Sequence, residues 1–175
     1  PLTLLGLERR HQALVIETGM DEFGQIRRLG EVIRPDVAII TIVDDVHLSH
    51  FGSREDILRA KAEIFENLRP GGLAVLNGDD ALLSTLRPDC ETVRCGFSDG
   101  CGVRVEGLER LGLDAIRCTV VTARDRYPLT IPSPAAHMAE LSALAVAAAE
   151  RLGLTADEII RGIAAYTPAD NRLRL

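Results

Sequence analysis

The stretch Asp36-Val-Ala-Ile-Ile-Thr-Ile-Val43 decides the fold, because it is a nearly continuous apolar run rich in β-branched residues. Runs without regular apolar–polar alternation are typical of parallel strands that are covered on both faces. A helical pattern follows over residues 53–68, and Leu73-Ala-Val-Leu-Asn77 then has the composition of another strand. The order strand, helix, strand predicts a βαβ unit and therefore a parallel sheet.

The neighbouring segments extend this pattern. Upstream, Ala13-Leu-Val-Ile-Glu17 predicts a strand, and residues 21–33 predict a helix that Arg34-Pro35 ends. Inside the βαβ unit, Ser53 and Asp56 predict the capped start of the helix. The helical stripe places Lys61 on the side that faces the sheet.

The second half of the chain changes character. Residues 92–97 can still form a strand of the sheet, whereas residues 98–132 contain β-rich runs joined by Gly- and Asp-bearing turns. These runs predict a small antiparallel β-meander. An alanine-rich helix is expected over residues 136–152, and Thr155-Ala-Asp-Glu158 is expected to cap a final helix. The predicted fold is therefore α/β, with a mostly parallel sheet flanked by helices and a small antiparallel appendage, in one domain spanning residues 1–175.

Composition limits the possible functions. The chain has 175 residues, of which 46% are hydrophobic, and a net charge of −6. This size and composition suit one folded domain, and the acidic balance argues against nucleic acid as a partner. The four cysteines lack paired C-x-x-C spacing, and no apolar run is long enough to span a membrane. We therefore expect reduced thiols and a cytoplasmic protein.

Polar side chains follow three successive predicted strands. Because ligands bind beyond the carboxyl ends of strands in open parallel sheets, we expect these groups to gather along one edge. Carboxylates with one imidazole would suit Mg²⁺ or Mn²⁺, with phosphate oxygens completing the shell. Each residue alone could equally be a helix cap, a solvated loop residue or part of a turn. The residues are Glu17, Asp44, Asp45, His47, Asn77, Asp79 and Asp80.

Lys61 is the only lysine among the 20 basic residues. An amine can lose its proton and form covalent adducts, which a guanidinium cannot do, so the retained lysine points to chemistry. An arginine-favouring codon composition is the alternative explanation. No G-x-x-x-x-G-K-[ST] phosphate loop occurs. A nucleotide function would therefore need a phosphate loop upstream of Pro1.

Five short motifs in order resemble the central, ATP-binding domain of the Mur ligases. The resemblance extends over residues 1–90, with a weaker match at His137 and at Asn171-Arg172. The motifs are Val15-Ile-Glu-Thr-Gly-Met20, Arg34-Pro-Asp-Val-Ala-Ile-Ile-Thr41, His47-Leu48 with Phe51-Gly-Ser53, Arg59-Ala-Lys-Ala-Glu-Ile-Phe65 and Gly72-Leu-Ala-Val-Leu-Asn-Gly-Asp-Asp80.

The resemblance implies an ATP- and Mg²⁺-dependent amide ligase of peptidoglycan precursor synthesis that works through an acyl phosphate. The most similar type adds D-Ala-D-Ala to a UDP-MurNAc-tripeptide. These two molecules are the expected partners, and we expect a cytoplasmic monomer. The resemblance also implies a chain cut before the phosphate loop and lacking the C-terminal domain, so that it would be inactive alone.

The same resemblance assigns roles to individual residues. Glu17 and His47 would be magnesium ligands, and Lys61 would carry a carbamate that helps to place a metal. His47 and Lys61 are thus the expected catalytic residues. Asn77 would contact adenine, Asp79 and Asp80 would shape its loop, and the remaining nucleotide contacts would come from His137 and Arg172.

Several positions depart from the family pattern. Ile42 replaces an asparagine, and Ser49 stands where a glutamate is common. Asp44 or Asp45 could compensate as a metal ligand. Around His137, Ala135 replaces a glycine, and Leu141 or Ser142 replaces an asparagine. These departures leave three alternatives: a non-catalytic Mur-like scaffold, a diverged Mur-family ligase for another amino acid, and a ligase that builds polyglutamate or a folate conjugate. The last usually has Asp-His, which Val46-His47 does not match.

Overall fold

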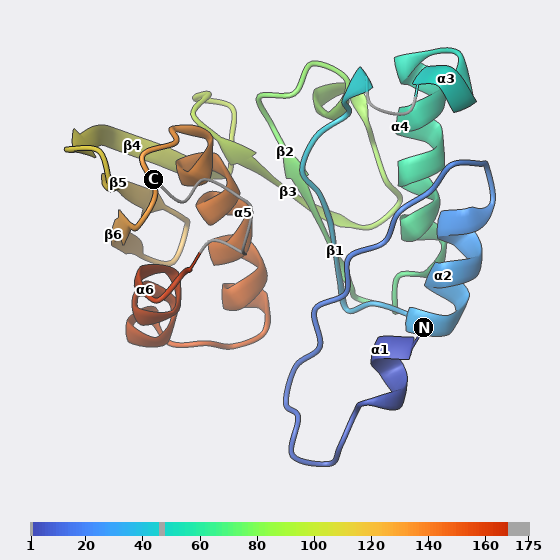
Figure 1. Ribbon diagram of the computed structural model, residues 1–175, viewed down its shortest axis with the longest axis horizontal. Coiled ribbons are helices and arrows are strands. Elements are labelled where there is room, and N and C mark those ends of the chain that lie inside the picture. Colours follow the sequence, from blue (N-terminus) through green and yellow to red (C-terminus); the bar gives the residue numbers. More distant parts are fainter. Residues whose placement is uncertain (1, 46–47, 168–175) are drawn as a thin grey trace.

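A computed structural model describes residues 2–45 and 48–167 (Figure 1). Its six strands form one sheet in the order β1-β2-β3-β4-β5-β6. The first four strands pair in parallel, and the last three pair antiparallel. The strands are β1 (Val37–Ile40), β2 (Leu73–Asn77), β3 (Glu91–Gly96), β4 (Val103–Leu111), β5 (Ala115–Val121) and β6 (Arg126–Ile131).

Helices cover both faces of this sheet. In Figure 1, α2 and α4 lie on one side of the parallel strands, and α5 lies on the other, next to α6. The helices are α1 (Leu2–Leu5), α2 (Gln25–Ile33), α3 (Leu48–Phe51), α4 (Arg54–Ala62), α5 (His137–Arg151) and α6 (Ala156–Ala164), with the short 3₁₀ helices η2 (Glu63–Asn67) and η3 (Leu83–Thr85).

Strand β2 is buried along its whole length and supplies both hydrophobic cores. Leu73 and Val75 belong to the core under α5 and α6, whereas Leu76 belongs to the core under α2 and α4. This division follows from the two-residue period of a strand, which sends successive side chains to opposite faces. Double coverage explains the nearly continuous apolar sequence of the parallel strands.

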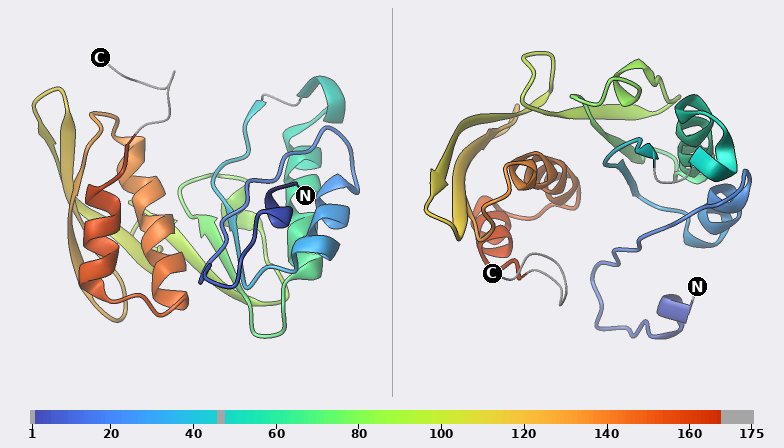
Figure 2. Two further views of the ribbon diagram at one scale, coloured as in Figure 1. Left: turned by 60° about the horizontal axis from the view of Figure 1, so that its bottom comes forward. Right: turned by 45° about the horizontal axis from the view of Figure 1, so that its top comes forward.

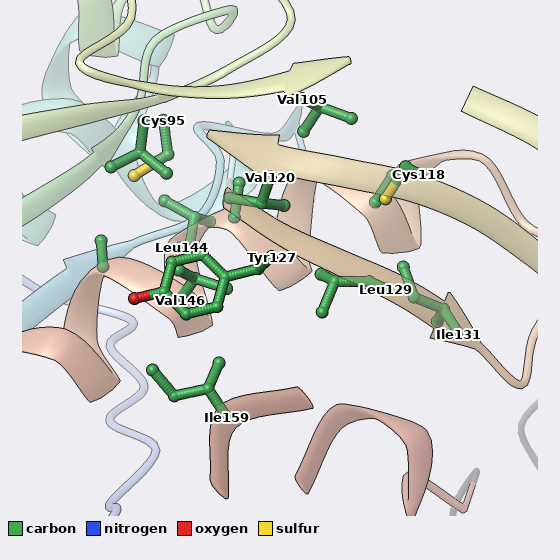
Figure 3. Packing of buried hydrophobic residues seen from close by; sticks show 14 of the residues in the cluster. Cys95, Val105, Cys118, Val120, Tyr127, Leu129, Ile131, Leu144, Val146 and Ile159 are labelled. Atoms are coloured by element: carbon green, nitrogen blue, oxygen red, sulfur yellow. The ribbon is translucent and has the colours of Figure 1, made fainter. Parts of the chain in front are cut away.

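The predicted antiparallel meander is present, and it continues the main sheet. Parallel pairing of Cys95 with Val103 and of Gly96 with Arg104 joins β3 to β4. Figure 2 shows the sheet as a curved layer with α5 and α6 on its concave side. Figure 3 shows Tyr127 of β6 beside Leu144 and Val146 of α5, with Leu129 and Ile131 farther along β6 and Ile159 on α6.

The strand predicted over residues 13–17 does not form. Residues 11–20 contain neither helix nor strand, and the side chain of Val15 is 90% exposed. A β-rich composition forms a strand only where a neighbouring backbone can pair with it, and β1 pairs with β2 alone among the described strands. The other predicted elements are present with some different bounds: α2 begins at Gln25, β1 ends at Ile40, and the helix predicted over residues 53–68 changes to the 3₁₀ helix η2 after Ala62.

Two further expectations can be compared with the structure. All four cysteines are free thiols. Within the described part of the chain, no helix has the length and apolar character needed to cross a membrane.

Candidate functional site

The carboxyl ends of β1 and β2 lie side by side and are joined by side chains. Asn77, the last residue of β2, is 6% exposed, and its Nδ2 donates a hydrogen bond to the carbonyl oxygen of Thr41 (3.0 Å). Its Oδ1 accepts one from the backbone N–H of Asp79 (2.9 Å). The Asn77 amide therefore holds the two strand ends and the following loop in one arrangement.

Asp79 extends this connection to the end of β3. Its carboxylate accepts hydrogen bonds from the N–H of Phe97 (2.5 Å) and the N–H of Ser98 (3.0 Å), and from the Ser98 hydroxyl. Burial alone would raise the pKa of Asp79, but these hydrogen bonds outweigh it and lower that pKa. A Cβ atom on Gly96 would lie 2.3 Å from Asp79 Oδ2, so this contact requires glycine.

Asp80 connects the same loop to the segment after β1. Its Oδ2 accepts a hydrogen bond from the N–H of Val43 (3.0 Å), and its Oδ1 accepts two from Leu82 and Leu83 (both 2.9 Å). The carboxylate thus satisfies two backbone N–H groups at the start of η3. Asp79 and Asp80 both order the loop through backbone N–H groups.

Arg54, at the start of α4, holds the segment after β1. Its Nη2 donates to the carbonyl oxygen of Val43 (2.6 Å), and its Nε lies 3.4 Å from Asp45 Oδ1. Helix α4 begins here because Ser53 Oγ accepts a hydrogen bond from the N–H of Asp56 (3.1 Å), as the sequence predicts. The cap therefore fixes the helix that carries both Arg54 and Lys61.

Lys61 is half-buried and lies within electrostatic reach of Asp44 and Asp80. Burial lowers the pKa of its ammonium group, while the two carboxylates act in the opposite direction. The Lys61 side chain on α4 therefore interacts electrostatically with the loops that follow β1 and β2. Burial favours the neutral amine, which is the form needed for reaction with CO₂.

Glu140, on the first turn of α5, belongs to this site and was missed by the sequence reasoning. It lies near the Asn77 side chain and interacts electrostatically with Asp79, Asp80 and His137. Burial raises the pKa of Glu140, and the Asn77 side chain opposes that rise. The available signal was its position three residues after His137, which places both in the same turn of a helix.

The remaining predicted residues have different positions. Glu17 is exposed on the segment that precedes α2. His137 is exposed at the start of α5, near Glu140. His47 and Arg172 lie outside the described residues.

The carboxylates at this sheet edge can be compared with the ligands that a metal ion requires. Across residues 2–45 and 48–167, no three His, Cys, Asp or Glu side chains are grouped closely enough to hold a metal ion. Mg²⁺ commonly uses only one or two carboxylates and completes its shell with water and phosphate oxygens. At this edge the carboxylate of Asp44 is exposed and interacts electrostatically with Lys61.

The fold and this arrangement define a class: an α/β domain whose polar site lies beyond the carboxyl ends of parallel strands. The family description "Mur ligase middle domain" matches residues 1–149, and the chain belongs to that family.

Several curated relatives carry the name UDP-N-acetylmuramoyl-tripeptide–D-alanyl-D-alanine ligase. The one from Haemophilus influenzae is 24% identical and the one from Bacillus subtilis 27% identical. These alignments cover 99% and 100% of this chain, but only 38% and 37% of the relatives. The chain thus spans little more than a third of their length.

Solved structures show the same fold. A crystal structure of MurF from Acinetobacter baumannii has a TM-score of 0.90 and 27% identity, covering 99% of this chain and 38% of that protein. The MurF ligase from Thermotoga maritima, solved in complex with ADP, has a TM-score of 0.72 and 23% identity. That match covers 85% of this chain and 34% of the Thermotoga protein.

Proposed function

We propose that the chain is the middle domain of an ATP-dependent ligase that joins D-Ala-D-Ala to a UDP-MurNAc-tripeptide. One observation carries the proposal: five relatives bearing that ligase name each match between 96% and 100% of the chain. The proposal includes a monomeric protein in the cytoplasm. Because the relatives are much longer, activity is assigned to the longer protein of which this domain would be a part.

ATP and Mg²⁺ are the proposed cofactors. The ADP complex of the Thermotoga ligase supports the nucleotide, and the carboxylates near Lys61 support the metal. When bound, Mg²⁺ would neutralise negative charge on phosphoryl oxygens and on the developing oxyanion. The ligands would be Glu17, His47 and either Asp44 or Asp45, with Lys61 contributing if it is carbamylated.

Lys61 has the central role in this proposal. Burial lowers its pKa and so increases the fraction of neutral amine that can take up CO₂. As a carbamate it would provide an oxygen donor, and as an ammonium it would neutralise phosphate charge. Asp44 and Asp80 would attract and orient the ammonium form, whereas the negatively charged carbamate would need a bound cation between it and these carboxylates.

The nucleotide base would lie near the loop after β2. Asn77, Asp79 and Asp80 would shape this part of the site through their hydrogen bonds to Thr41, Phe97 and Val43. His137 would approach from the start of α5, and Arg172 would reach a phosphate. Glu140 is added to this group because it interacts electrostatically with Asp79, Asp80 and His137.

The test uses the full-length protein. Phosphate should be released from ATP only when both UDP-MurNAc-tripeptide and D-Ala-D-Ala are present, with one amide product formed for each phosphate. Hydrolysis that is independent of the dipeptide and yields no ligation product would contradict the proposal.

A non-catalytic scaffold is the second candidate. The observation that favours it is the inward use of the buried Asn77 amide, which donates a hydrogen bond to Thr41 and accepts one from Asp79. Calorimetric titration of the full-length protein with Mg²⁺ and a non-hydrolysable ATP analogue separates the two candidates. Binding supports the ligase, and absence of binding supports the scaffold.

A further inference from the structure

Glu63, on η2 directly after the Lys61 helix, is a buried carboxylate with no role in the site described above. Its side chain is 6% exposed, and it is the one buried charged residue within the described ranges. An isolated buried charge is unfavourable, so its partners indicate what it does.

The partners are backbone N–H groups at the start of α2. The Gly24 N–H lies 2.8 and 2.9 Å from the two carboxylate oxygens of Glu63, and the Arg27 N–H lies 3.2 Å from Oε2. The first N–H groups of a helix have no partner within the helix, and its N-terminus attracts negative charge. Gly24 itself makes no side-chain cap, so Glu63 supplies the cap from 36 to 39 residues away.

The capped helix start is continuous with the segment that carries Glu17. Between them, Met20 is buried in the core that also contains Val43 and Phe51. Phe23 packs edge-on against Phe51, with ring centroids 5.2 Å apart. Residues 20–24 therefore pack against the core that α2 and α4 cover. At the end of this segment, the Gly24 N–H donates hydrogen bonds to Glu63.

We propose that Glu63 is a positioning residue that sets where Glu17 lies relative to Lys61. Glu63 and Lys61 are two residues apart, so the carboxylate connects the Glu17 segment to the element that carries the lysine. This inference rests on the proposed ligase function, in which Glu17 is a magnesium ligand. Glu63 would act on the metal only through the backbone it holds.

Glu66 provides a matched control. It lies on η2 and also contacts α2, but its partners are the Arg27 side-chain atoms Nε (2.6 Å) and Nη2 (3.0 Å). Glu66 is solvent-exposed, and among the described residues it accepts hydrogen bonds from the Arg27 side chain and none from the backbone at the start of α2. Glu66→Gln therefore removes a contact between the same elements without removing the cap.

The experiment compares Glu63→Gln and Glu66→Gln in the full-length protein. Outer-shell partners of metal ligands typically contribute roughly 10–100-fold to metal affinity. We expect the Mg²⁺ concentration at half-maximal activity to rise about tenfold in Glu63→Gln, within that range, and to stay near wild type in Glu66→Gln. Calorimetric Mg²⁺ binding in the presence of an ATP analogue should shift in parallel, and amide hydrogen exchange at Gly24 and Arg27 should accelerate only in Glu63→Gln.

A double-mutant cycle with Glu17→Gln identifies the route of the effect. If Glu63 acts through Glu17, Glu63→Gln should leave Mg²⁺ binding unchanged in the Glu17→Gln background, because the effects are non-additive. A lower unfolding temperature with unchanged Mg²⁺ binding would overturn the inference, as would equal effects of the two glutamate variants. Should Glu63→Gln not fold, Glu63→Asp, which retains the charge with a shorter reach, is measured in the same way.

The outcome for wild type separates this inference from the proposed function. Wild-type protein without Mg²⁺ binding or ligation would overturn both. An active, Mg²⁺-dependent wild type with an unaffected Glu63→Gln variant would overturn the positioning role alone.

Discussion

The Nδ2 atom of Asn77 donates a 3.0 Å hydrogen bond to the carbonyl oxygen of Thr41. These residues are 36 positions apart, and the bond joins the ends of two parallel strands where ladder pairing stops. Because Asn77 also accepts from the N–H of Asp79, one buried amide fixes both strand ends and a loop. The site geometry therefore depends on a side chain that is itself almost inaccessible.

Asn77→Ala should destabilise the fold. The substitution removes the hydrogen bonds to the Thr41 carbonyl and from the Asp79 N–H, and each such bond contributes about 1 kcal/mol. Denaturant unfolding measures this loss. Asn67→Ala, which removes a single hydrogen bond to the carbonyl of Arg27, is the control and should cost less. Equal losses in the two variants would contradict the role assigned to Asn77.

Asp79→Asn should destabilise the protein in a pH-dependent manner. Hydrogen bonds lower the pKa of the folded-state carboxyl, so its contribution is present above the unfolded pKa of about 3.9 and is lost as pH falls through the folded value. The expected loss at neutral pH is about 1 kcal/mol, because the carboxylate is exposed and screened. Unfolding curves of wild type and variant should converge in acid, and a gap that widens in acid would contradict the assignment.

Gly96→Ala should also destabilise the loop. The new Cβ would lie 2.3 Å from Asp79 Oδ2, and the carboxylate can move away only by giving up hydrogen bonds to Phe97 and Ser98. Overpacking of this kind costs about 1–3 kcal/mol. Gly100→Ala is the control, since no atom lies within 4 Å of its added Cβ. Thermal unfolding should separate the two variants.

Tyr127→Phe tests the hydrogen bond between Tyr127 and Glu150 at the core under α5 and α6. The Tyr127 hydroxyl donates to Glu150 Oε1 (2.7 Å), and burial together with that carboxylate raises the pKa of Tyr127 to about 12. The unfolded phenol ionises near pH 10, so the stabilisation is complete below about pH 10 and is lost as pH rises through 12. The variant should lose about 1 kcal/mol at neutral pH. It should also lack the tyrosinate absorbance step near pH 12, and persistence of that step would contradict the pKa assignment.

Lys61 should form a carbamate in bicarbonate. Burial lowers the pKa of its amine, so neutral amine is available for reaction with CO₂. Native mass spectrometry of the full-length protein should show an added mass of one CO₂ that disappears in Lys61→Arg. Lys61 is the only lysine in this domain, so the variant is specific for it here. The same adduct in both proteins would place the modification elsewhere.

The elements that form from local signals were predictable from the sequence. Strand β2 has the predicted bounds, and the capping box of Thr155 and Glu158 begins α6 as expected. In contrast, Ala13–Glu17 has strand composition but no pairing partner, and composition cannot reveal whether a neighbouring backbone is present.

The candidate site was predictable only in part. Asp44, Lys61 and Asp80 lie near one another because the strands before Asp44 and Asp80 are parallel and end at the same edge of the sheet. The apolar pattern of the sequence was enough to predict these parallel strands. The contacts of Glu140 with Asn77 and of Glu63 with Gly24 depend on how the helices pack against the sheet and against each other. No local sequence pattern predicts this packing. The metal, nucleotide and catalytic roles of all the site residues, His47 and Arg172 among them, remain predictions.

The burial of β2 on both faces has a consequence for folding. Its alternate residues belong to two cores built from different halves of the chain. Helices α2 and α4 precede β2 in the sequence, whereas α5 and α6 follow it. Neither half can lose its core without exposing one face of the same strand. Hydrogen exchange should therefore report one cooperative unfolding unit, in which a substitution on either face of β2 lowers the protection of both halves.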